Sequence, residues 1–189
     1  MNKIILASQS PRRKQLLEWA EVHFDIVIQP TDESFPASMP VEEVPVHIAL
    51  HKAKAVQSLL TPAQQEQTIL AADTVVVLDN RIIGKPQHRA DAIAILAALS
   101  GNTHRVITGV VLVKATNVIS FADITTVHFH QLTQEQITFY IDKYQPYDKA
   151  GAYAIQEWIG VVGIKSVEGD FYNVMGLPVS RVVQELAKL

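Results

Sequence analysis

The spacing of apolar residues along the chain predicts alternating strands and helices. Short apolar runs bounded by turn-forming residues predict strands at 3–7, 24–28, 69–78, 81–83, 106–113, 118–129, 152–155 and 161–168. Apolar residues at helical spacing predict helices at 11–20, 46–60, 90–99, 133–144 and from Pro178 to the end of the chain. Because hairpins interrupt the alternation, we expect a mixed-sheet α/β or α+β fold rather than a purely parallel sheet.

Capping and turn residues mark several of these boundaries. Ser10 precedes Pro11, which is the order of an N-cap followed by proline in the first helical position. Thr133 and Gln136 have the spacing of a capping box, so a helix should begin there. The dipeptide 79–80 (DN) predicts the tight turn of a hairpin.

The composition is that of one globular domain. The chain has 189 residues, 48% of them hydrophobic and 19% charged, and it contains no internal repeat and no flexible linker. We therefore expect a single domain over residues 1–189. The sequence has no cysteine, which excludes disulfides, a thiol nucleophile, a cysteine-based zinc site and an iron–sulfur cluster.

Charge and hydropathy narrow the class of protein further. Sixteen Lys and Arg against 19 Asp and Glu give a formal net charge of −3, which argues against bulk binding of nucleic acid. No apolar run reaches the roughly 18 residues of a membrane helix. The apolar stretch at 4–7 is too short for a signal peptide. We therefore expect a cytoplasmic protein with no membrane segment.

Residues 8–13 (SQSPRR) lie between a predicted strand and the start of a helix. Backbone N–H groups and the helix dipole favour an anion at such a junction, and Arg12 and Arg13 add forked donors that suit phosphate oxygens. A capped helix with solvated arginines explains the same residues, and the motif alone favours that simpler interpretation. It is not a Walker loop, because the glycines and the Lys-Ser/Thr pair are missing.

Asp73 interrupts the apolar run at 69–78. Because an unpaired buried charge is costly, Asp73 should lie at a strand end or bulge, or meet a metal or a cationic partner. A turn or capping role explains it equally well. Its place beside the expected centre of the sheet makes it the best candidate for a general base or a metal ligand.

Further charged and polar groups lie at element boundaries. Glu33 follows the second predicted strand, Lys52 lies on a predicted helix, and Lys85 stands between a glycine and a proline that restrict its backbone. Each of these alone is more typical of a surface residue. Gln156 ends the stretch 148–156 (DKAGAYAIQ), and its amide offers the donor and acceptor that suit a nucleobase edge, although an ordinary edge strand explains the stretch as well.

Other catalytic motifs are missing from the sequence. There is no H-E-x-x-H zinc motif, no G-x-S-x-G nucleophile elbow and no G-x-G-x-x-G dinucleotide loop. His128 and His130 alternate along a predicted strand, where a solvated face is a simpler explanation than a metal site.

Taken together, and in this order, these pieces resemble the Maf family of nucleoside triphosphate pyrophosphatases. Each motif is weak alone, but the match is collinear over nearly the whole chain. The matching stretches are 7–13 (ASQSPRR), 32–33 (DE), 49–53 around Lys52, 72–74 (ADT), 84–86 (GKP), 99–101 (LSG), 108–109 (TG), 148–153 (DKAGAY) with 155–156 (IQ), and 173–178 (NVMGLP).

The resemblance implies both a fold and a reaction. The family has an elongated, bent mixed sheet with flanking helices, and two lobes enclose a nucleotide cleft, similar to the inosine triphosphatase fold. Its members cleave a nucleoside triphosphate between the α- and β-phosphates, releasing a monophosphate and pyrophosphate with the help of a divalent metal.

The resemblance also implies the catalytic groups. Asp73 matches the family's proton acceptor, and Glu33, Lys52 and Lys85 join it as catalytic residues. Asp73 and Glu33 carry the oxygen ligands that Mg²⁺ or Mn²⁺ requires. Whether Asp73 acts chiefly as base or as metal ligand stays open at this point.

The resemblance implies the substrate contacts as well. Ser8, Arg12 and Arg13 match substrate-binding positions, while Arg12, Thr74 and Gln156 match the specificity positions of the branch that acts on dTTP and UTP. The sister branch, which acts on 7-methyl-GTP, typically has Trp, Gln and a Lys-Ser-Glu-like stretch at those places. Glu157 departs from the pattern, since a glycine often follows the Gln; an extra carboxylate there could alter base selectivity or metal affinity.

Two alternatives remain at this stage. One is the same chemistry on 7-methyl-GTP or another modified nucleotide, and the other is a nucleotide-binding inhibitor of septum formation. A house-cleaning role and a homodimer are suggested only by analogy with the family.

Overall fold

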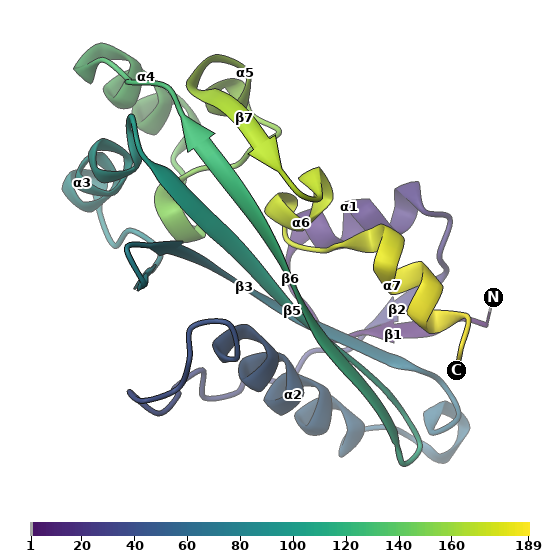
Figure 1. Ribbon diagram of the computed structural model, residues 1–189. Coiled ribbons are helices and arrows are strands. Elements are labelled where there is room, and N and C mark those ends of the chain that lie inside the picture. Colours follow the sequence, from purple (N-terminus) through teal and green to yellow (C-terminus); the bar gives the residue numbers. More distant parts are fainter. Residues whose placement is uncertain (1) are drawn as a thin grey trace. The chain divides into compact units, whose positions relative to one another are not determined.

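The computed structural model describes residues 2–189 (Figure 1). The strands are β1 (Ile4–Leu6), β2 (Phe24–Ile26), β3 (Ile69–Leu78), β4 (Arg81–Ile83), β5 (Thr103–Lys114), β6 (Asn117–Phe129) and β7 (Ile164–Glu168). The helices are α1 (Pro11–Trp19), α2 (Val44–Gln57), α3 (Arg89–Leu99), α4 (Gln134–Tyr144), α5 (Trp158–Gly163), α6 (Phe171–Met175) and α7 (Val179–Leu186), with short 3-10 turns η1 (Pro62–Gln64) and η2 (Ala150–Ala152).

The strands form one mixed sheet, as the sequence predicts. Its order is β2-β1-β3-β5-β6-β7, and β4 pairs with β3 beside this path. Strand β1 is parallel to both β2 and β3, whereas β3 with β4 and β6 with β7 are antiparallel. The predicted mixed α/β architecture is therefore confirmed.

The chain divides into two compact units. The first contains residues 2–74, Thr108–Asp123 and Gly176–Leu189, and the second contains Val75–Ile107 and Ile124–Met175. Strands β3, β5 and β6 each contribute residues to both units. The predicted nucleotide cleft between two lobes stays a prediction.

Helix α2 packs closely on the strands of the first unit. Ala49 and Ala53 on the helix are fully buried in one cluster with residues of β1, β3 and β5. Gly109 on β5 permits this approach, because an added Cβ would lie 2.2 Å from the backbone nitrogen of Val46. Figure 1 shows α2 beside β3 and β5. The small residues thus bring Lys52, which lies between the two alanines, close to the sheet.

The second unit packs helices α3 and α4 together. The predicted capping box of α4 is present, with the Thr133 hydroxyl accepting the Gln136 N–H and the Gln136 side chain accepting the Thr133 N–H. Arg89 on α3 forms two hydrogen bonds to the carboxylate of Asp142 on α4, at 2.6 and 2.9 Å. None of the helices described in residues 2–189 is both long and apolar enough to span a membrane.

Two sequence predictions for the second unit are wrong. Residues 152–155 do not form a strand: η2 occupies 150–152, with Gly151 at φ +71° and Ala152 at φ +57°, and these left-handed conformations are incompatible with extended pairing. The strand predicted at 161–168 begins only at Ile164, because α5 includes the first three of these residues. The short helix α6 was not predicted.

A buried histidine makes the second unit sensitive to acid. Burial lowers the pKa of His104 to about 4, with a smaller contribution from His128. The Nε2 atom of His104 lies 2.7 Å from the hydroxyl oxygen of Tyr153. The His104 ring stacks on that of Phe129, with ring centroids 5.4 Å apart. Since the unfolded chain takes up this proton near pH 6.5 and the folded chain does not, the contribution of His104 to the free energy of unfolding should be constant above that pH. This contribution should fall as the pH drops toward 4.

We expect His104 to contribute about 3 kcal/mol to this loss by pH 4, since each pH unit between the two pKa values is worth about 1.4 kcal/mol. Urea unfolding of the wild type and His104→Gln, from pH 7.5 to pH 4, measures it. The variant should show a flatter profile, and the exposed His130→Gln should follow the wild type. Identical profiles for wild type and His104→Gln would contradict the assignment.

Candidate active site

Two carboxylates of the first unit share one lysine. Lys52 on α2 places its Nζ 2.7 Å from Glu33 Oε1 and 2.8 Å from Asp73 Oδ1. The side chains of Lys52 and Asp73 are only 19% and 15% exposed, whereas that of Glu33 is 54% exposed. Three of the four residues predicted to be catalytic are therefore in direct contact.

The position of Asp73 on β3 explains this contact. The strand is buried directly before and after Asp73 and Thr74, which are themselves partly exposed. A carboxylate at such a place needs a partner, because transfer from water without one is costly. The ammonium group of Lys52 is that partner, which is one of the alternatives that the sequence left open for Asp73.

Arg13 occupies the interior of the first unit. It is 8% exposed, and its guanidinium donates through Nε to the Gly176 carbonyl at 2.7 Å, through Nη1 to the Ser8 hydroxyl at 3.0 Å, and through Nη2 to the Thr74 hydroxyl at 2.9 Å. Burial lowers the pKa of Arg13, and Arg12 lowers it further, whereas the charges of Asp73 and Glu33 oppose this shift. Arg13 thus ties α1, β3 and the segment before α7 together.

The two predicted site hydroxyls are held within the same network. Ser8 accepts from Arg13 and also from the backbone N–H of Ser10 at 3.3 Å. The Thr74 hydroxyl lies 3.0 Å from that of Thr108 as well as accepting from Arg13. Arg12 precedes Arg13 in the first turn of α1 and is partly exposed.

Two members of this network had no role in the sequence predictions. Gly176 offers its carbonyl to Arg13, and its φ of +117° favours glycine. Thr108 contacts Thr74 from β5. Both belong to stretches that match the family, 173–178 and 108–109, but neither stretch by itself contains a group whose chemistry indicates a partner.

The remaining predicted residues belong to the second unit. Lys85 is exposed just after β4, and the neighbouring Gly84 carbonyl accepts the N–H of Gly151 at 3.2 Å. Gln156 is also exposed, directly after the buried Ile155. The roles assigned to Lys85 and Gln156 stay predictions.

The chemistry of Glu33 and Asp73 fits a divalent cation. Magnesium is often bound through one or two carboxylates, with substrate phosphates and water supplying the other oxygens. Residues 2–189 contain no group of three or more His, Cys, Asp or Glu side chains that could hold a metal by themselves. A site made of these two carboxylates would therefore need further oxygens, from substrate phosphates or from water.

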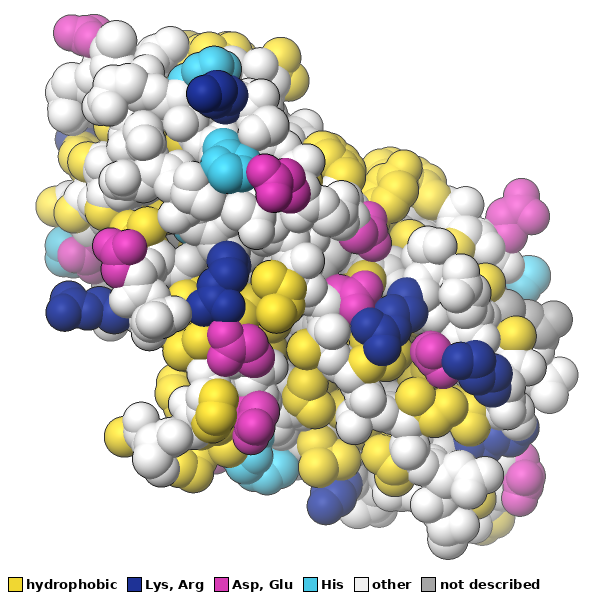
Figure 2. Space-filling view, in the orientation of Figure 1, with side chains coloured by type: hydrophobic (Ala, Val, Ile, Leu, Met, Phe, Trp, Pro, Cys, Tyr) yellow, Lys and Arg dark blue, Asp and Glu magenta, His cyan; other side chains and the backbone are white. Residues whose placement is uncertain are grey.

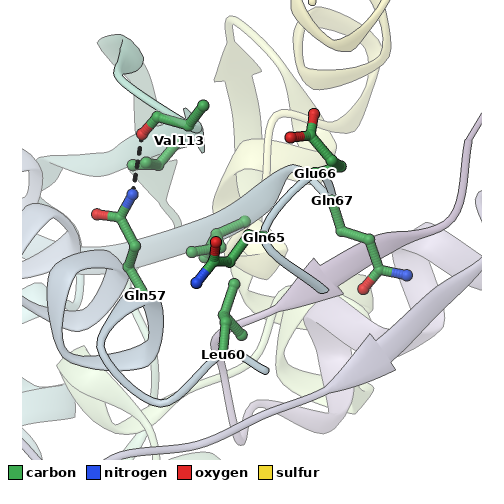
Figure 3. A pocket seen from close by; sticks show the side chains of 8 residues that line it. Gln57, Leu60, Gln65, Glu66, Gln67 and Val113 are labelled. Atoms are coloured by element: carbon green, nitrogen blue, oxygen red, sulfur yellow. Dashed lines mark hydrogen bonds between the residues drawn. The ribbon is translucent and has the colours of Figure 1, made fainter. Parts of the chain in front are cut away.

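A pocket elsewhere in the first unit is a poor candidate for the active site. It has a volume of about 230 Å³ and is lined by apolar and amide side chains, with Glu66 as its one charged lining residue. Figure 3 shows it between the end of α2 and the start of β3, where Gln57 donates to the Ala115 carbonyl at 2.9 Å. None of the predicted site residues lines it, and it lacks the cations that a triphosphate needs.

Basic and acidic side chains are interspersed on the surface. On the face that Figure 2 shows, Lys and Arg lie next to Asp and Glu over most of the molecule. This face therefore offers a highly charged anion particular groups rather than a broad basic surface.

Comparisons with known proteins show the fold and the family of this chain. The structure of the Staphylococcus aureus Ham1 protein matches with a TM-score of 0.52 at 13% identity, covering 99% of this chain and 98% of that one, which shows the fold. The chain is 46% identical to a dTTP/UTP pyrophosphatase of Bacteroides thetaiotaomicron over 188 residues, 99% of this chain and 96% of the relative. A dTTP/UTP pyrophosphatase of Cytophaga hutchinsonii is 47% identical over 186 residues, 98% of this chain and 84% of the relative. The model of the Maf-like protein family matches residues 3–189, so the chain belongs to the Maf family.

Proposed function

We propose that this protein hydrolyses dTTP and UTP to the nucleoside monophosphate and pyrophosphate. The observation that carries the proposal is the Glu33–Lys52–Asp73 cluster, which joins two carboxylates and an ammonium group on three segments of the first unit. The activity named for relatives at 46–47% identity over nearly the whole chain supports the same reaction.

The reaction needs a base and a means of stabilising the leaving group. A water oxygen bonds to the α-phosphorus, the bond from this phosphorus to the bridging oxygen breaks, and pyrophosphate leaves with the bonding electrons. Because Lys52 contacts Oδ1 of Asp73, we assign acceptance of the water proton to Oδ2. No covalent intermediate is needed.

The cations of the site have different tasks. A triphosphate carries about four negative charges, and the net charge of −3 gives the protein no general attraction for it. We assign direct phosphate contacts to Arg12, Lys52 and Lys85. Arg13 already donates to three protein oxygens, so its charge supports the site while its hydrogen bonds fix Ser8 and Thr74.

A divalent metal completes the proposal. Glu33 and Asp73 would hold Mg²⁺ or Mn²⁺, which supplies charge neutralisation on the phosphates and lowers the pKa of a bound water. We retain the cytoplasmic location expected from the sequence as part of the proposal. We also retain the homodimer and the house-cleaning role, which rest on the family resemblance.

Base selection is assigned to Arg12, Thr74 and Gln156. Thymine and uracil share an O4 acceptor and an N3–H donor, which an amide such as that of Gln156 complements. Cytosine reverses this pattern and would leave polar groups unpaired, at about 1–3 kcal/mol each, enough for roughly 10- to 100-fold discrimination.

The proposal predicts the products and the order of substrates. With Mg²⁺ and no added inorganic pyrophosphatase, chromatography should show UMP and pyrophosphate from UTP, and kcat/KM should be highest for dTTP and UTP. Free orthophosphate without pyrophosphate would contradict the reaction. A best rate with 7-methyl-GTP, or equal rates for CTP and UTP, would contradict the assignment of the specificity residues.

A further inference from the structure

The turn that carries Gln156 is held at both ends by one tyrosine hydroxyl of the second unit. Tyr140 on α4 donates its O–H to Oε2 of Glu157 and accepts the backbone N–H of Ala154 at 3.1 Å. The turn is closed by the N–H of Glu157, which donates to the Ala154 carbonyl at 3.1 Å. The hydroxyl therefore fixes the separation of residues 154 and 157, with Gln156 between them.

The surroundings of the Tyr140 hydroxyl favour donation of its one hydrogen to Glu157. Burial raises the pKa of Tyr140, and the hydrogen bond to Glu157 raises it further, so the hydroxyl stays protonated. Lys149, whose side chain is only 11% exposed, places its Nζ 3.7 Å from Glu157 Oε1 and 2.7 Å from Asp148. The carboxylate of Glu157 thus has a donor and a cation, both within the same unit.

Packing leaves the turn little freedom in other directions. Ala154 and Ile155 are 5% and 4% exposed, while Gln156 is exposed. On the side of α5, a Cβ added to Gly160 would lie 1.7 Å from the Ile155 carbonyl oxygen, so backbone meets backbone there. The turn therefore presents the exposed Gln156 side chain from a packed base.

We propose that Tyr140 and Glu157 are positioning residues that fix the direction of Gln156 and so determine the preference for thymine and uracil over cytosine. The inference rests on the proposed function, in which Gln156 contacts the base. The carboxylate of Glu157 contacts Tyr140 and Lys149. We therefore expect Glu157 to act on the nucleobase indirectly, through the conformation of the turn.

The test compares three variants of this contact with a matched control. Tyr140→Phe removes only the hydroxyl, Glu157→Ala removes the acceptor, and Glu157→Gln keeps an oxygen that can accept from Tyr140. Tyr144→Phe is the control, because it makes the same change on the same helix, and the Tyr144 ring stacks on Tyr140 at 5.0 Å. Steady-state kinetics with UTP and CTP are paired with hydrogen exchange at residues 154–157 in nucleotide-free protein.

We expect Tyr140→Phe and Glu157→Ala to lower the UTP-to-CTP ratio of kcat/KM about tenfold, as the loss of a hydrogen bond to a charged group allows. The loss should come mainly from a higher KM for UTP, with faster exchange at 154–157. Glu157→Gln should keep the ratio within about twofold of the wild type, and Tyr144→Phe should match the wild type.

Three results would overturn the inference. Faster exchange at 154–157 with an unchanged UTP-to-CTP ratio would show that the contact holds the turn without directing Gln156. An equal fall in kcat for both nucleotides would show a general structural role. A wild type without preference for UTP over CTP would contradict the proposed base selection itself, and the exchange data would then report only on the turn.

Discussion

Asp73→Asn should lower kcat for dTTP by about 10²- to 10⁴-fold while the protein stays folded. The amide has nearly the volume of the carboxylate but cannot accept the proton of the attacking water, and loss of a general base typically costs this much. It also removes one of the two negative charges proposed to hold the metal, which adds to the loss. Lys52 keeps its contact with Glu33 at 2.7 Å, so the cluster retains one of its two ion pairs.

The measurement is kcat at saturating dTTP and Mg²⁺, together with the melting temperature. Asp79→Asn is the matched control, because Asp79 is exposed at the end of β3 and its φ of +49° suits asparagine. The control should keep the wild-type rate. If Asp73→Asn retained more than half of the wild-type kcat, Asp73 would be a structural partner of Lys52 and the mechanism would be wrong.

Local sequence patterns were sufficient to predict the bounds of β3, which carries Asp73, and of its hairpin partner β4. The run at 69–78 and the hairpin partner at 81–83 were predicted with the bounds that β3 and β4 have, because apolar residues continue up to the turn at 79–80. At that turn both Asp79 and Asn80 have positive φ, the conformation that a two-residue hairpin requires.

The wrong strand prediction at 152–155 has its cause in a contact between residues that are distant in the sequence. The stretch at 152–155 has the composition of a strand, but the N–H of Gly151 donates to the Gly84 carbonyl and the following residues turn instead of pairing. The spacing of apolar residues within a stretch gives no information about a contact with a segment more than sixty residues away.

The same limit applies to the active site. The costly position of Asp73 in an apolar run indicated that it needs a partner, but not that Lys52 would be this partner. The arginine pair by itself favoured a capped helix with solvated arginines over an anion site. Solvation is wrong for Arg13, which is buried and donates to Gly176 near the other end of the chain. Collinear resemblance to a family supplied the set of predicted site residues, and the structure shows which of them are in contact.

Lys52→Met should have the second large effect, lowering kcat/KM for dTTP by about 10²- to 10³-fold. This is the typical cost of removing one preorganised group that stabilises charge developing in the transition state. Methionine keeps most of the side-chain volume but leaves Asp73 and Glu33 facing each other without the ammonium group. Lys52→Arg should be intermediate, since it keeps the charge but not the geometry of a single donor at 2.7 Å from one carboxylate and 2.8 Å from the other.

Loss of an ion-pair partner also destabilises a fold, so the experiment must separate the two effects. Lys54→Met, two residues along the same helix and exposed, controls for removal of a positive charge and should keep wild-type kcat/KM. The double variant Lys52→Met/Glu33→Gln removes one of the two like charges, so its melting temperature should recover toward that of the wild type. Its activity should not recover, because neither substitution restores the positive charge. Recovery of both stability and activity would show that Lys52 only neutralises Glu33 and Asp73, and the direct phosphate contact assigned to it would then be wrong.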